Sequence, residues 1–243
     1  MSTITNIKSA LSRIAAAIVA AYKTGAGQPA LGPAATPNIN ALLLNLCDGD
    51  RDRALWVLRW LAYPLRNEGA KMATALLVSG VSGSGKSLFF EQVIKPLYGN
   101  RAITPRKPLN SPFNDWMNSK LFVLVDEFRL SPSIAPRVKQ LISNPTILIN
   151  SKGRQETVER NSMNFVFMSG ASDPLINDTN NRRFMVIEPR KALPQAVYAG
   201  VAQEIASGGI EAFYHFLLQQ LDTDDFCTRT APLNKKSTMK EAA

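Results

Sequence analysis

The sequence predicts an α/β fold in which a mostly parallel sheet lies between helices. Three short, continuous apolar runs, at residues 73–78, 121–125 and 164–168, are typical of strands that are buried on both faces. Segments with helical patterns alternate with these runs, at residues 87–97, 111–118 and 133–143. Strands that alternate with helices favour a parallel sheet that is covered on both sides.

The N-terminal third is predicted to be helical and to be built in three parts. Residues 1–24 form an amphipathic helix whose apolar side chains recur at steps of three and four: Ile4, Ile7, Leu11, Ile14, Ile18 and Tyr22. Residues 25–37 are rich in glycine, proline and alanine and are predicted to be a linker. Residues 38–71 hold two short helices, at 38–47 and 51–65, that form a collar between subunits or pack on the next domain.

The remaining chain divides into a core and a C-terminal segment. Residues 72–190 hold the three strands and are predicted to be the core domain. Residues 191–243 are predicted to be helical, with a helix near 210–221, and to end in a basic tail. The tail contains the lysines Lys235, Lys236 and Lys240.

Composition and charge restrict the classes of function. The 243-residue chain has a net charge of +9 and a pI near 9.7, which favours a polyanionic partner. Cys47, Cys227 and a single histidine are too few for a disulfide scaffold or a structural zinc site. No apolar run approaches the roughly 20 residues that span a bilayer, so no membrane is expected. We expect a reducing, cytoplasmic setting.

A phosphate-binding loop follows the first predicted strand. The loop fits the G-x-x-x-x-G-K-[ST] pattern at every fixed position and leads into a predicted helix. Its residues are Gly80, Val81, Ser82, Gly83, Ser84, Gly85, Lys86 and Ser87. Backbone N–H groups of such a loop cradle phosphates, and the lysine adds a charge for the β- and γ-phosphates. The sequence therefore predicts a P-loop that binds ATP.

An acidic pair ends the second predicted strand. Asp126 and Glu127 come directly after residues 121–125, forty residues beyond Lys86. A P-loop NTPase holds Mg²⁺ with the loop hydroxyl and an acidic residue of this kind, here Ser87 and Asp126. Glu127 is then placed to polarise the attacking water, which favours hydrolysis of ATP over its transfer to an acceptor.

Taken in order, these and other motifs resemble those of superfamily 3 helicases, in the branch of phage and poxvirus-type primase–helicases. The resemblance runs from about residue 56 to 239 and rests on segments at 60–65, 113–116, 126–127, 181–184, 208–212 and 231–233. It implies an AAA+-like P-loop ATPase that works as a ring of identical subunits, a hexamer being favoured. The implied partner is single-stranded or forked DNA.

A hairpin is predicted between the second and third strands. Residues 146–150 and 156–160 can pair across a turn that holds Lys152, Gly153 and Arg154. In the resembled family a hairpin at this position projects into the ring channel and contacts the DNA backbone. Lys152 and Arg154 are therefore candidate phosphate contacts, the alternative being an ordinary basic surface turn.

The resemblance also implies a polar sensor and a trans-acting arginine. Ser169 follows the third strand at the sensor position, but Gly170 stands where the family has an asparagine. The sensor amide is therefore missing, and Ser169, Ser172 or Asp173 are the candidates to orient water in its place. Arg182 and Arg183 lie where the family has an arginine that reaches the γ-phosphate of the neighbouring subunit. One of the two is expected to make internal contacts instead.

Together these features predict an ATP-dependent DNA helicase or translocase in the replication of a phage or mobile element. The main alternative is an ATP-switched DNA-binding or loading protein that does not unwind DNA. A third hypothesis is a small-molecule kinase of the P-loop class. This hypothesis leaves Lys152, Arg154 and the arginine pair without a role.

Overall fold

The computed structural model describes residues 30–170 and 182–232 of the chain. The predicted helix at residues 1–24, residues 25–29 of the linker and the lysines of the tail lie outside the described residues. Also outside them are Ser172 and Asp173. Within the described residues, no helix is long and apolar enough to cross a membrane.

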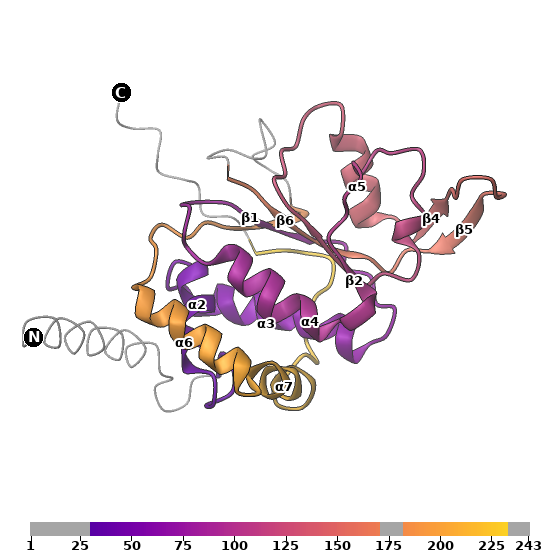
Figure 1. Ribbon diagram of the computed structural model, residues 1–243. Coiled ribbons are helices and arrows are strands. Elements are labelled where there is room, and N and C mark those ends of the chain that lie inside the picture. The colour runs from indigo at the N-terminus through magenta and orange to yellow at the C-terminus, as the bar shows by residue number, and fades with distance from the viewer. Residues whose placement is uncertain (1–29, 171–181, 233–243) are drawn as a thin grey trace, which may run out of the picture.

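A five-stranded sheet forms the centre of the molecule, in the order β2-β3-β6-β1-β7 (Figure 1). All its neighbouring strands run parallel. The strands are β1 (Ala75–Val78), β2 (Ala102–Ile103), β3 (Phe122–Val125), β6 (Asn164–Met168) and β7 (Phe184–Ile187). The prediction of an α/β fold with a mostly parallel sheet is confirmed, as are strands β1, β3 and β6.

Alternate side chains of the central strands enter two separate hydrophobic clusters. From β1, Leu76 and Val78 enter the first cluster, whereas Ala75 and Leu77 enter the second. Both sets are fully buried, because helices or loops cover both faces of the sheet. This explains why each strand is a continuous apolar run rather than an alternating one.

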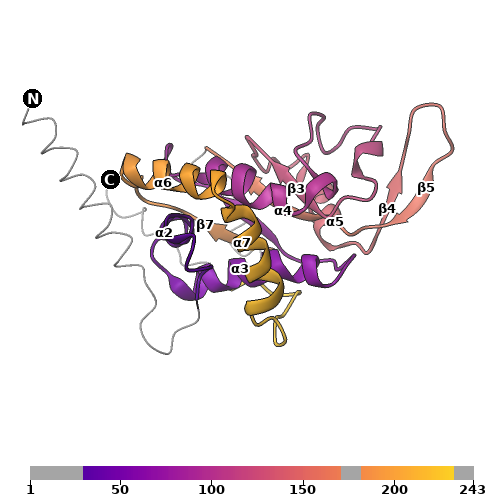
Figure 2. The same cartoon turned by 60° about the horizontal axis from the view of Figure 1, so that its bottom comes forward.

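Helices from the N-terminal, middle and C-terminal parts of the described chain cover one face of the sheet (Figures 1 and 2). They are α2 (Pro37–Leu46), α3 (Arg51–Arg66), α4 (Lys95–Leu97), α6 (Gln195–Ala206) and α7 (Gly209–His215). Two π-helical stretches, Leu88–Ile94 and Phe216–Gln220, join this layer. Glu204 joins α6 to the start of α2, because its carboxylate accepts hydrogen bonds from the Asn38 and Ile39 N–H groups at 2.8 and 2.9 Å.

The opposite face carries α5 (Ala135–Ser143) and a short loop segment. A helix at residues 111–118 was predicted there, and this prediction is wrong: only Asp115–Met117 is helical, as a single 3₁₀ turn. The physical reason is a competing partner. The backbone of Asn114 pairs with that of Asn150, so the preceding residues cannot continue a helix.

Two strands of the sheet were not predicted. β2 has only two residues, too few to leave a pattern in the sequence. β7 is an apolar run of four, but it follows the arginine pair directly and was read as part of that motif. The hairpin, in contrast, is confirmed: β4 (Thr146–Ile149) and β5 (Thr157–Arg160) pair antiparallel and form a separate two-stranded sheet.

Candidate active site

The P-loop connects the end of β1 to the π-helical stretch Leu88–Ile94 and requires glycine at two crowded positions. Gly80 has φ of 104°, and a Cβ there would lie 2.7 Å from the Pro189 carbonyl oxygen. Gly85 has φ of 89°, and a Cβ there would lie 2.6 Å from Leu42 Cδ1. Both positions therefore combine a left-handed conformation with close contact, which only glycine tolerates.

The Lys86 side chain folds back over the loop. Its Nζ donates hydrogen bonds to the carbonyl oxygens of Gly80 at 3.0 Å and Val81 at 2.8 Å. Burial lowers the pKa of Lys86, and the Asp126 carboxylate opposes this shift. A lysine held in this way is already at the loop and can exchange backbone acceptors for phosphate oxygens.

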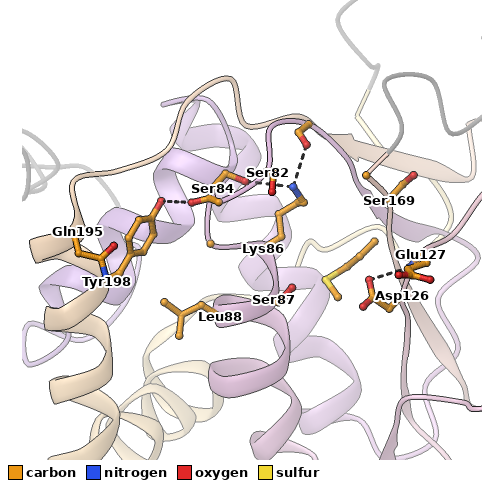
Figure 3. Close-up of a pocket in the computed structure, with 15 residues that line it drawn as sticks. Ser82, Ser84, Lys86, Ser87, Leu88, Asp126, Glu127, Ser169, Gln195 and Tyr198 are labelled. Carbon is orange, nitrogen blue, oxygen red and sulfur yellow. Dashed lines mark hydrogen bonds between the residues drawn. The ribbon is translucent and has the colours of Figure 1, made fainter.

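The loop opens onto a cavity of about 560 Å³ (Figure 3). A volume of this size is ordinary for a small-molecule or cofactor site. Along with the P-loop, the cavity is lined by Asp126, Glu127, Ser169, Gln195 and Tyr198. These residues meet because β6 lies between β1 and β3, so the carboxyl ends of three parallel strands share one edge of the sheet.

The acidic pair has a constrained backbone. The Glu127 N–H donates to Asp126 Oδ1 at 2.9 Å, and Glu127 has φ of 51°, an uncommon value for a residue other than glycine. The next residue, Phe128, donates its N–H to the Met168 carbonyl at 2.8 Å, which anchors the turn to β6. This turn fixes where both carboxylates enter the cavity.

The residues that line the cavity fit a magnesium ion bound together with a triphosphate. Ser87 and Asp126 both line the cavity and supply a hydroxyl and a carboxylate oxygen, the hard ligands that Mg²⁺ prefers. Few protein ligands are needed, because phosphate oxygens and water complete the octahedral shell of Mg²⁺ in such sites. Among the described residues there is no group of three His, Cys, Asp or Glu side chains that could hold a metal alone.

Two cavity residues from α6 were not identified from the sequence. The Tyr198 hydroxyl donates to the Gly83 carbonyl at 2.8 Å and accepts from the Leu193 N–H at 2.8 Å. It thus ties the P-loop to the start of α6, with Gln195 beside it on the cavity wall (Figure 3). Both residues lie more than a hundred positions beyond the loop, so no local pattern could have indicated them.

The other predicted site residues divide between the cavity and its surroundings. Ser169 lines the cavity, and its N–H donates to the Val78 carbonyl at 2.9 Å; exposed Gly170 is beside it. Arg182 and Arg183 do not line the cavity. Neither do Lys152 and Arg154, which are exposed at the tip of the hairpin, well away from the P-loop side of the sheet (Figure 1).

Comparison with known proteins shows similarity to a family of unknown function and to one phage protein. Residues 77–183, which contain every predicted site residue, match a family of unknown function, DUF5906. The chain is similar to the DNA primase-polymerase of Nitratiruptor phage NrS-1, with 28% identity over 165 residues. That match covers 65% of this chain and 23% of the phage protein.

The fold is similar to solved structures of the NrS-1 C-terminal region. Its apo structure matches with a TM-score of 0.68 and 26% identity, over 81% of this chain and 48% of that one. An A-form apo structure matches with a TM-score of 0.72 and 26% identity, over 86% and 51%. The chain thus spans about a quarter of the curated relative and about half of each solved region.

Proposed function

We propose that this chain is an AAA+-like P-loop ATPase that moves along and unwinds DNA during phage or mobile-element replication, as a ring of identical subunits. The observation that carries the proposal is one cavity in which the P-loop, after β1, faces the two carboxylates that follow β3, with β6 lying between these strands. The similarity to a phage DNA primase-polymerase supports a role beside DNA synthesis. The net charge of +9 and the basic hairpin tip suit a polyanionic partner.

Four cavity residues have a defined task in this proposal. Lys86 neutralises charge on the β- and γ-phosphates, while Ser87 and Asp126 hold Mg²⁺. Glu127 accepts a hydrogen bond from the attacking water and orients it toward the γ-phosphate. When bound, the metal ion supplies electrostatic stabilisation of the phosphate oxygens.

A second function is favoured by one observation. Gly170 offers no side chain at the sensor position. No atom of another described residue, apart from its two chain neighbours, lies within 4 Å of the place where a Cβ would be. A site without a polar amide there can bind ATP and couple its hydrolysis poorly to movement. This favours an ATP-switched DNA-binding or loading protein, which would change its affinity for DNA without separating strands.

Strand separation distinguishes the two functions. We expect the wild-type protein with ATP to displace the labelled strand of a forked duplex. Glu127→Gln, which retains Lys86 and Asp126, should bind ATP normally but hydrolyse it at least a hundredfold more slowly and displace no strand. ATP-dependent DNA binding with no displacement by the wild type would favour the loading protein. Loss of ATP binding in Glu127→Gln would show that the acidic roles are misassigned.

A further inference from the structure

The β4–β5 hairpin depends on contacts outside itself for its position. Among the described residues it pairs with no strand of the central sheet, and an isolated two-stranded hairpin is at best marginally stable in water. One face packs inward through Ile147 and Ile149. On the other face the cross-strand partners Leu148 and Val158 are 47% and 70% exposed. The hairpin projects beyond the rest of the fold (Figure 2).

The base of the hairpin is fixed by Asn161, the residue that follows β5. The Asn161 side-chain amide donates to the carbonyls of Leu141 at 3.0 Å and Asn144 at 2.8 Å, in the last turn of α5 and at its C-cap. The Asn161 N–H also donates to the Pro145 carbonyl at 2.8 Å. These bonds hold the base of the hairpin but reach no further along β4.

A second asparagine, from a distant segment, holds β4 itself. The Asn114 N–H donates to the Asn150 carbonyl at 3.1 Å, and Asn114 Oδ1 accepts from the Asn150 N–H at 2.7 Å. Asn114 Nδ2 donates to the Leu148 carbonyl at 2.8 Å. Asn114 thus acts as a one-residue strand beside β4, with its side chain supplying one acceptor and one donor.

Asn114 is itself a rigid point. It is 4% exposed, and its carbonyl accepts from the N–H of Met117, which is buried in the second hydrophobic cluster. Only a carboxamide offers an acceptor and a donor at this spacing. Aspartate has the same shape, but it would set a second oxygen against the Leu148 carbonyl.

We propose that Asn114 is a positioning residue that sets where the β4–β5 hairpin presents Lys152 and Arg154 to DNA. This inference rests on the proposed function, in which the hairpin tip contacts phosphates. Asn114 comes from the segment that leads into β3, and Asp126 and Glu127 directly follow β3. The position of the hairpin is therefore tied to the strand that precedes the acidic pair.

The test compares Asn114→Asp with Asn118→Asp, the same change four residues away at an exposed side chain. In hydrogen exchange, amides of residues 146–150 should exchange on the order of tenfold faster in Asn114→Asp. Amides of β1 and β3 should stay protected in both variants, which shows that the fold is intact. Unchanged exchange across residues 146–150 would overturn the positioning role. If Asn114→Asp does not fold, the smaller and uncharged Asn114→Ser is measured in its place, with the same expectations.

DNA binding provides the second readout, with a single-stranded oligonucleotide as the probe. Asn114→Asp should weaken binding by roughly tenfold and leave DNA-free ATP hydrolysis within about twofold of wild type. Added to Lys152→Ala with Arg154→Ala, it should cause little further loss, because it acts through the same tip. Fully additive losses would overturn the proposal. If the tip variant alone binds DNA normally, the DNA-contact role of the hairpin fails, whereas the exchange result still decides the role of Asn114.

Discussion

At the scale of single residues, the two neighbouring arginines have different environments. Arg183 Nε donates to the Ser143 hydroxyl at 2.9 Å, and its carbonyl accepts from the Ala75 N–H at 2.7 Å. Arg182 is exposed. These contacts favour a structural role for Arg183, and they leave Arg182 as our candidate for reaching the active site of a neighbouring subunit.

This assignment predicts different outcomes for the two alanine variants. Arg182→Ala should cut ATP hydrolysis by on the order of 10³-fold with ATP affinity retained, since such an arginine stabilises charge in the transition state. Arg183→Ala should instead lower the melting temperature. The measurement is steady-state hydrolysis beside thermal unfolding. Mixing Arg182→Ala with Lys86→Ala protein should restore some activity at shared interfaces, once subunit exchange is demonstrated with labelled protein. Full activity of Arg182→Ala would contradict the assignment.

At the scale of elements, the hairpin predicts how binding responds to salt. Lys152 and Arg154 are exposed on either side of Gly153, whose φ of 74° forms the turn. Replacing both by alanine should lower the slope of log affinity against log salt by about 0.7 for each lost phosphate contact. The matched control is Arg106→Ala with Lys107→Ala, which removes the same charge from exposed positions outside the hairpin. Equal changes in both double variants would indicate a general charge effect.

The sequence predicted elements well where the local pattern decided the structure. Strand β6, the glycine-rich turn after β1 and the hairpin were predicted because a buried strand, a glycine-rich turn and a basic turn each have a local signature. The helix at residues 111–118 was wrong because a partner 36 residues away, Asn150, pairs with Asn114. Tyr198 was missed for the same reason: its contacts with the P-loop are made by folding and leave no trace nearby in the sequence.

At the scale of the whole molecule, the half-buried Lys71 makes the stability of the fold depend on pH. Lys71 Nζ donates to the carbonyls of Leu141, at 2.9 Å, and Met163, and lies 5.3 Å from the centre of the Phe165 ring. Burial lowers its pKa from 10.5 to about 7. Lys71 is therefore largely neutral in the fold at pH 8 and protonated in the unfolded chain.

Between these two pKa values the unfolded chain binds a proton that Lys71 lacks in the folded protein. The free energy of unfolding therefore rises with pH in that window, and this gain is lost as the pH falls toward 7. Between pH 7.5 and 8.5, the free energy of unfolding of the wild type should rise by about 1 kcal/mol relative to Lys71→Met. Denaturant titrations at the two pH values measure this difference. The exposed variant Lys152→Met should follow the wild type. Parallel pH profiles for wild type and Lys71→Met would show that Lys71 does not titrate in this range.

The central claim is that this cavity hydrolyses ATP and that DNA engages the same molecule. Its most direct test is the rate of ATP hydrolysis with and without single-stranded DNA, measured for the wild type, Lys86→Ala and Lys95→Ala. Lys95 lies further along the helical segment that follows the P-loop, where its Nζ donates to the Thr104 hydroxyl at 2.8 Å. We predict hydrolysis that DNA stimulates several-fold in the wild type and Lys95→Ala, and none in Lys86→Ala. Wild-type turnover by Lys86→Ala, or a wild-type rate that DNA does not change, would contradict the account.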